Sequence, residues 1–200
     1  MPHTRPPHRD PMLKSDRLIL RGFRAPDVST LESLIEDPII AQEAPHWTRP
    51  YPGESVEKWI ERCVEEAKLG ARASFAVFQA QGSRLVGHVG LRIEPRHARA
   101  ELSCWIGKPY RGHGMATEAC RSVVQYGFET LVLDRIFAFY PVDQAGTGRL
   151  WKKLGLRQEG TLKKHFKREE ERVDVHTLGL MRDEFWVLKF TDPKVTQTKP

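Results

Sequence analysis

The sequence predicts one mixed α/β domain in which helices pack on a central sheet. Its 200 residues are enough for a single domain with a sizeable core. Hydrophobic residues make up 40% and charged residues 29%, as is typical of a globular chain. Strand patterns and helical patterns follow one another with no internal repeat, so the elements are expected to share one core.

Apolar periodicity places the individual elements. The expected strands are residues 18–21, 73–79, 85–91, 101–106, 135–140, 160–166 and 173–180. The expected helices are one after Asp27, one from Ser55, one over residues 116–131 and one around residues 150–154. Asp27 and Ser55 are expected to cap their helices through side-chain oxygens, and Gly155 to end the last helix.

The two ends of the chain differ from the middle. Residues 1–12 carry four prolines and few apolar residues, which predicts a flexible arm. Residues 191–200 are polar and end in proline, which predicts a tail. The folded domain is therefore expected to span residues 13–190.

Charge and composition exclude several classes of protein. The chain has 32 basic and 26 acidic residues, and this net charge of +6 favours an anionic ligand or partner. Acids are interleaved with the basic residues and no nucleic-acid-binding signature is present, so direct nucleic-acid binding is not expected. No apolar run of membrane-spanning length and no secretory signal are seen. Three cysteines without metal-type spacing predict reduced thiols in the cytoplasm and no metal site.

A glycine-rich loop is the sharpest local signal. Strand 101–106 leads into Arg111-Gly112-His113-Gly114-Met115-Ala116, and a helix begins at once. Glycine lets backbone N–H groups approach a ligand closely, and the first N–H groups of a helix have no internal partner. The loop is therefore a candidate phosphate site, although it matches neither a Walker loop nor a dinucleotide fingerprint. Alternatively, the glycines only close the turn.

This loop resembles the Gln/Arg-x-x-Gly-x-Gly/Ala signature of the GNAT acyltransferase superfamily. Residues 100–119 are similar to the branch that holds the ribosomal-protein N-terminal acetyltransferases of the Rim type. Residues 15–21 and 154–160 resemble the same branch, and the resemblance covers roughly residues 13–186. It implies a strongly bent, mixed sheet of about seven strands flanked by helices. The sheet would split between its fourth and fifth strands, with acetyl-CoA as co-substrate in the split.

The resemblance also implies which residues bind acetyl-CoA. Trp105 and Ile106 would bind its pantetheine arm through their backbone, and the side-chain amide of Gln144 would contact that arm. Basic residues of the helix at 149–153 would attract the ribose phosphate, or else form a solvated face. The residues implied for the pyrophosphate are Arg111, Gly112, His113, Gly114, Met115, Ala116 and Thr117.

The implied chemistry is direct attack of an amine on the thioester. An α-amine has a pKa near 8 and a lysine near 10.4, so neutralising the lysine at pH 7 costs about 3 kcal/mol more. Glu101 is the candidate base, and the alternative is a salt bridge with Arg96 or Arg99. Thr147 is the candidate donor to the departing thiolate, unless its hydroxyl bonds its own backbone. Trp151 stands where many members have a tyrosine that protonates the thiolate.

The acceptor is expected on the side opposite the co-substrate. Residues 45–51 could line that pocket or simply pack, and the charged turn at 163–172 could be solvated or could hold a peptide or a dimer partner. A protein N-terminus, such as that of a ribosomal protein, is the expected acceptor. The alternatives are a small amine (a polyamine, aminoglycoside or amino acid) and a non-catalytic acyl-CoA-binding regulator. The chain could be a monomer or a homodimer.

Overall fold

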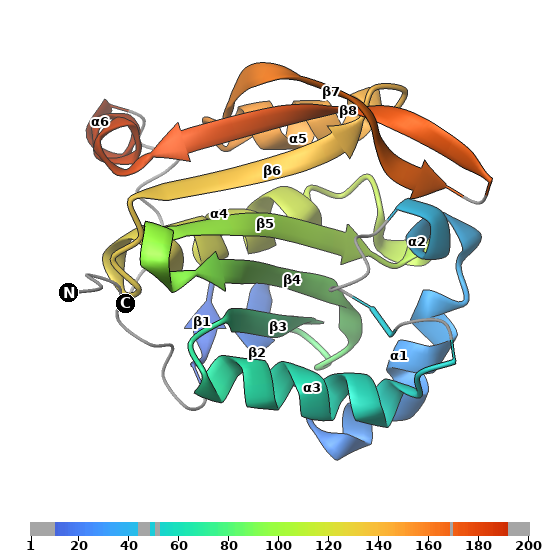
Figure 1. Ribbon diagram of the computed structural model, residues 1–200. Coiled ribbons are helices and arrows are strands. Elements are labelled where there is room, and N and C mark those ends of the chain that lie inside the picture. The colour runs from blue at the N-terminus through green and yellow to red at the C-terminus, as the bar shows by residue number, and fades with distance from the viewer. Residues whose placement is uncertain (1–10, 44–48, 51–52, 169, 192–200) are drawn as a thin grey trace.

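The computed structural model describes residues 11–43, 49–50, 53–168 and 170–191. They form one eight-stranded sheet in the order β1-β2-β3-β4-β5-β6-β8-β7 (Figure 1). All neighbouring strands are antiparallel except β5 and β6, which are parallel, so the sheet is mixed as predicted. The strands are β1 (Leu13–Lys14), β2 (Leu18–Arg21), β3 (Arg72–Gln79), β4 (Leu85–Glu94), β5 (Arg99–Ile106), β6 (Arg135–Pro141), β7 (Arg157–Arg168) and β8 (Glu171–Met181).

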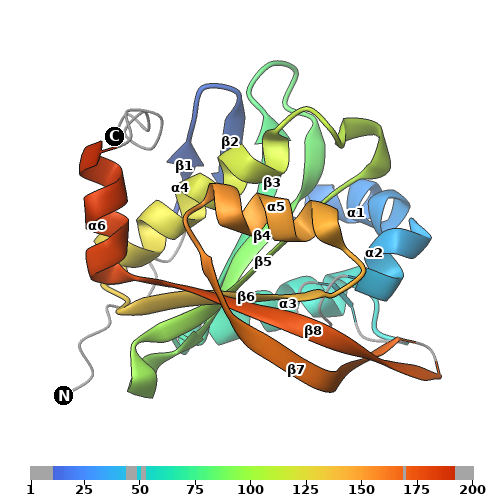
Figure 2. The ribbon, with the colours of Figure 1, turned by 90° about the horizontal axis from the view of Figure 1, so that it is seen from above.

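Helices cover both faces of the sheet (Figure 2). One face packs against α4 and α5, and its core includes Val123 of α4 and Trp151 of α5. The other face packs against α1 and α3, and its core includes Leu31 and Trp59. The helices are α1 (Val28–Ile35), α2 (Pro38–Glu43), α3 (Val56–Lys68), α4 (Met115–Glu129), α5 (Ala145–Lys153) and α6 (Arg182–Thr191).

The parallel pair β5 and β6 creates the feature that positions the site. The two strands pair only over residues 99–101 and 135–137. Beyond this point they diverge toward their carboxyl ends (Figure 1). This confirms the predicted split, which lies one strand later in the count because β1 adds a strand at the edge.

The sequence prediction missed three short or terminal elements. Strand β1 is only two residues long, too short to show an alternating pattern, and its pairing with Ile19 and Leu20 defines it. The sheet therefore has eight strands rather than about seven. Helix α2 begins at Pro38, after an Asp37 carboxylate that accepts from Ile39 N at 3.0 Å. That Asp-Pro start is typical of a helix N-terminus. Helix α6 was also not predicted.

One predicted helix cap is confirmed and one is wrong. The Ser55 hydroxyl accepts a hydrogen bond from Lys58 N, as expected for an N-cap. Asp27 precedes α1 but makes no cap bond to that helix. A 3₁₀ turn over Ala25–Asp27 comes first, and it directs the Asp27 carboxylate back to Arg24 N (2.8 Å) and the Arg21 guanidinium (2.8 and 2.9 Å).

Some of the remaining predictions fall on residues that the structure does not describe, and others can be compared with it. Most of the arm at 1–12, the tail after residue 191 and most of the loop at 45–51 lie outside the described residues. The predicted charged turn at 163–172 is mostly strand, because β7 extends to Arg168 and β8 begins at Glu171. No helix in the described ranges is long and apolar enough to cross a membrane.

Candidate active site

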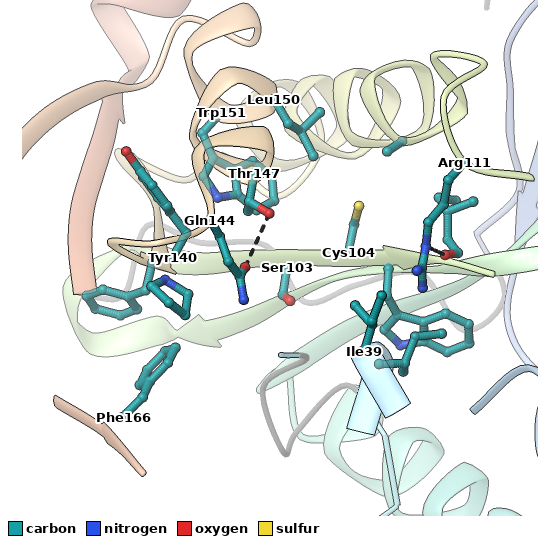
Figure 3. A pocket seen from close by; sticks show the side chains of 16 residues that line it. Ile39, Ser103, Cys104, Arg111, Tyr140, Gln144, Thr147, Leu150, Trp151 and Phe166 are labelled. Carbon is teal, nitrogen blue, oxygen red and sulfur yellow. Dashed lines mark hydrogen bonds between the residues drawn. The ribbon is translucent and has the colours of Figure 1, made fainter. Parts of the chain in front are cut away.

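A cavity of about 200 Å³ lies where β5 and β6 diverge (Figure 3). Strand β5 forms its floor, the start of α5 one wall, and the end of β6 with β7 another. Residues from α2 and from the start of α4 complete the lining. The lining residues are Ile39, Ile40, Ser103, Cys104, Trp105, Ile106, Arg111, Ala116, Phe139, Tyr140, Pro141, Gln144, Thr147, Leu150, Trp151 and Phe166.

Strand β5 presents an open backbone edge to this cavity. It pairs with β4 along its whole length, but among the described residues its other edge has no strand partner beyond Glu101. Gly87 on β4 allows the end of β5 to lie this close, because a Cβ at that position would be 2.3 Å from the Trp105 carbonyl oxygen. The open edge can therefore hydrogen-bond an extended ligand that carries amides, as a further strand would.

The glycine-rich loop has the backbone that its sequence predicts. Gly112 and Gly114 have φ of +82° and +76°, a region that side chains disfavour, and Gly114 occupies the N-cap of α4. The loop and the first turn of α4 thus offer N–H groups at the positive end of a 15-residue helix.

The Arg111 side chain makes two hydrogen bonds within the protein. Its Nε donates to the Ile106 carbonyl at 2.7 Å and its Nη2 to the Asp37 carboxylate at 2.8 Å. These bonds tie the loop to the end of β5 and to the start of α2. Arg111 therefore helps to hold the loop in shape, and it also lines the cavity.

A second anchor holds the loop from the N-terminal side of the chain. The Glu118 carboxylate in α4 accepts from Ser15 Oγ (2.8 Å), Arg17 N (2.9 Å) and Arg17 Nε (2.7 Å). Arg17 Nη1 in turn donates to the His113 carbonyl at 3.0 Å. Burial raises the pKa of Glu118, but the bonds from Ser15 and Arg17 outweigh it and hold the pKa below its usual value.

We expect Glu118→Gln to loosen this anchor. The variant should be less stable at pH 7 by about 1 kcal/mol, because charge-assisted hydrogen bonds of a partly exposed carboxylate are lost. A carboxyl with a lowered pKa stabilises the fold above its unfolded pKa, near 4.3, and loses that effect as pH falls through the folded pKa. The difference between the wild type and the variant should therefore shrink on acidification.

Urea unfolding at pH 7 and at pH 3 measures this difference. Glu61→Gln, at an exposed position of α3, is the matched control and should change stability little at either pH. A Glu118→Gln variant as stable as the wild type at pH 7 would contradict the anchor.

Helix α5 and its N-cap residue bring three polar side chains to the cavity. The Thr147 hydroxyl donates to Gln144 Oε1 at 3.4 Å, so it bonds a side chain rather than its own backbone (Figure 3). Gln144 Nε2 and Trp151 Nε1 are both buried and have no hydrogen-bond partner within the described parts of the chain. Buried N–H groups are nearly always hydrogen-bonded, so these two are candidates to donate to an acceptor that enters the cavity.

Glu101 lies beside the cavity rather than in its lining. The residue is 4% exposed, and its Oε2 lies 2.5 Å from Arg92 Nη2 on the neighbouring strand. The ion pair therefore forms with Arg92, directly opposite in the β4–β5 register, and Arg99 pairs with Glu94 instead. Glu101 nevertheless shares a strand face with Ser103, which does line the cavity.

An aromatic cluster that the sequence did not reveal closes the other end. The Phe139 ring lies 6.2 Å from the Phe166 ring and 5.4 Å from the His165 ring, centroid to centroid. Phe137 lies 5.5 Å from Phe139 on the same face of β6. Phe137 and Phe139 are two positions apart in β6, and this spacing is the one signal that could have indicated an aromatic wall.

The predicted site residues divide into two groups. Those that line the cavity are Trp105, Ile106, Arg111, Ala116, Gln144 and Thr147. Those that are not in the lining but lie in the loop, at the start of α4 or on β5 are Glu101, Gly112, His113, Gly114, Met115 and Thr117. Within the described residues, the lining holds no carboxylate and no histidine. Among those residues no cluster of side chains has the composition of a metal site.

Comparisons with known proteins agree with this geometry. Residues 17–157 match the family described as acetyltransferase (GNAT) domain. YoaA of Bacillus subtilis (strain 168), an uncharacterized N-acetyltransferase, is 27% identical over 182 residues, which cover 86% of this chain and 97% of YoaA.

Two solved structures from Vibrio cholerae share the fold. A spermidine N-acetyltransferase in complex with CoA and spermine superposes with a TM-score of 0.74 at 24% identity, over 86% of this chain and 99% of that one. A protein described as "a putative ribosomal-protein-serine acetyltransferase" superposes with a TM-score of 0.73 at 22% identity, over 88% and 99%. At these identities the likeness establishes the fold alone.

Proposed function

Because the chain belongs to the GNAT acetyltransferase family, we propose that it transfers the acetyl group of acetyl-CoA to the N-terminal α-amine of a protein, such as a ribosomal protein. The observation that carries the proposal is the cavity between β5 and β6, which joins an open strand edge to a phosphate-type loop. Members of the family are N-acetyltransferases that use acetyl-CoA. The acceptor is the part that the proposal adds.

Each part of the donor has a matching part of the cavity. The pantetheine arm carries amides that can bond the open edge of β5 near Trp105 and Ile106 and accept from the unpartnered Gln144 Nε2. The pyrophosphate fits the N–H groups from Arg111 to Thr117. The thioester then lies near Thr147, between β5 and the start of α5.

The charge of the lining favours an α-amine over a polycation. Arg111 is the one charged residue in the described lining, and no carboxylate is there to bind several ammonium groups. A polyamine enters with two or more positive charges and would need such carboxylates. An α-amine has a pKa near 8, so a neutral fraction exists at pH 7 without a strong base. The Phe139 and Phe166 rings suit the apolar side chain of an N-terminal residue.

The reaction needs only a modest base. We retain Glu101 as the proposed base, acting through a water molecule, since Glu101 is not in the lining but shares a strand face with Ser103, which is. Its bond to Arg92 fixes the carboxylate in place. If Glu101 serves only that ion pair, its loss changes stability and leaves turnover unchanged.

Glu101→Gln separates these two roles. As a base, Glu101 should contribute about 100-fold to kcat, and the variant should lose most near pH 6, where little acceptor is neutral. Rates from pH 6 to pH 9 give the profile, and Arg92→Gln is the matched control that breaks the same ion pair. Equal turnover of wild type and Glu101→Gln across this range would remove Glu101 as the base.

A thiol-release assay tests the acceptor. The panel pairs a peptide with a free N-terminus, the same peptide with a blocked N-terminus and an internal lysine, spermidine and a free amino acid. We expect CoA release with the free peptide and very little with the blocked one. Faster release with spermidine would contradict the proposal in favour of a polyamine acetyltransferase. Donor binding without release for any acceptor would favour the non-catalytic regulator.

A small amine is the second candidate, because one structural neighbour is a spermidine N-acetyltransferase. The lining without carboxylates argues against it.

We place the reaction in the cytoplasm, since all three cysteines are free thiols.

A further inference from the structure

The wall of the cavity formed by α5 holds a hydrogen-bond donor with no partner. Trp151 is 2% exposed and lines the cavity, yet its indole Nε1 has no partner among the described residues. A buried donor that is left unpaired destabilises the folded state. Such an atom in a native cavity indicates a ligand that accepts a hydrogen bond from it.

Trp151 shares its wall of the cavity with two other polar side chains, Gln144 and Thr147. Thr147 and Trp151 are four residues apart on α5 and so share a helix face. Figure 3 shows both beside Gln144, on the side of the cavity that faces Ser103 of β5. The N-terminal end of α5, next to Gln144 and Thr147, adds a partial positive charge to this side of the cavity. The described lining holds no carboxylate, which would repel an anion. The position therefore favours an acceptor that becomes negative.

We propose that Trp151 donates its indole N–H to the sulfur that leaves the acetyl group and so stabilises CoA as a thiolate. This inference rests on the acetyl transfer proposed above. The amine lone pair forms the new N–C bond, and the electrons of the broken C–S bond stay on sulfur. The amine proton passes through water to the base. The indole keeps its own proton, because Trp Nε1–H acts only as a hydrogen-bond donor.

This arrangement explains how the site works without a proton donor at this position. Thiols ionise near pH 8.5, so CoA can leave as the unprotonated thiolate. It then takes up a proton from solvent after release. A hydrogen bond to an ion is roughly twice as strong as one between neutral groups. The Trp151 bond therefore strengthens as charge develops on sulfur, which lowers the barrier more than it tightens acetyl-CoA binding.

Trp151→Phe tests the proposal, because it removes the N–H and keeps an aromatic ring. Calorimetry at pH 9 compares CoA with desulfo-CoA, which lacks the sulfur. The wild type should prefer CoA by about tenfold, the size of one charge-assisted hydrogen bond. The variant should lose this preference and keep its affinity for desulfo-CoA. Its kcat should fall about tenfold with little change in KM for acetyl-CoA.

The matched control is Trp186→Phe, which removes an indole N–H from α6, outside the cavity lining. It should keep both the CoA preference and kcat, and thermal melting should show that both variants are folded. Equal weakening of CoA and desulfo-CoA by Trp151→Phe would overturn the proposal, since the bond would then go to another part of the donor. An unchanged preference and kcat would overturn it as well. Failure of the wild type to bind either ligand would overturn the donor site itself.

Discussion

Ala116→Trp should abolish donor binding while the protein stays folded. Ala116 lines the cavity at the first turn of α4, next to the loop N–H groups proposed to bind the pyrophosphate. An indole there would project into a cavity of about 200 Å³ and keep the phosphates from those groups. Each charge-assisted bond is worth about 1.5–3 kcal/mol, so losing two should weaken CoA binding by roughly 100-fold or more.

Calorimetric titration with CoA measures this loss. Ala25→Trp makes the same change at an exposed alanine far from the cavity, and it should bind CoA like the wild type. Unchanged CoA affinity in Ala116→Trp would show that the donor does not occupy the start of α4.

Acidification should destabilise the fold through His88. This side chain is fully buried on β4, stacked against Phe23 and Trp105 with ring centroids 5.6 and 6.0 Å away. Burial, and secondly the positive charge of Arg72, lower its pKa to about 3. The unfolded chain takes up a proton near pH 6.5 and the folded chain does not. Stability should therefore fall by about 1.4 kcal/mol per pH unit from pH 6.5 toward pH 3.

The effect should reach roughly 4 kcal/mol at pH 3.5, a large part of the stability of a typical domain. Urea unfolding from pH 7 to pH 3.5 measures this loss of stability. His88→Gln should lose less stability over the same range, by about the same 4 kcal/mol. His97→Gln, at an exposed position, is the control and should keep the wild-type slope. As a second readout, the His88 ring should give the NMR shifts of a neutral imidazole down to pH 4. Protonation near pH 6.5 would contradict the prediction.

Local features of the site could be predicted because residues that are close together in the sequence determine them. The turn at Gly112 and Gly114, the helix that follows and the order of strands around them depend on backbone preferences within a few positions. The Ser55 cap depends on a residue three positions away. These interactions are short-range, so sequence patterns identify them well.

The walls of the cavity could not be predicted because they come from chain segments far apart in sequence. Ile39, Phe139 and Phe166 line one cavity although they come from α2, β6 and β7, and only the alternation of Phe137 and Phe139 within β6 hints at any of them. The same holds for the ion pair of Glu101, whose partner Arg92 is set by the β4–β5 register. It holds as well for the bond between the Arg111 guanidinium and Asp37, which lies 74 residues earlier in the chain.

A crystal structure with CoA bound is the most direct test of the account. We predict pantetheine density along the open edge of β5, between β5 and β6, with the pyrophosphate against the loop at Gly112 to Ala116. The sulfur should lie within hydrogen-bond reach of Thr147 and Trp151. CoA bound at any other surface, with this cavity unchanged, would contradict the assignment of the cavity as the donor site.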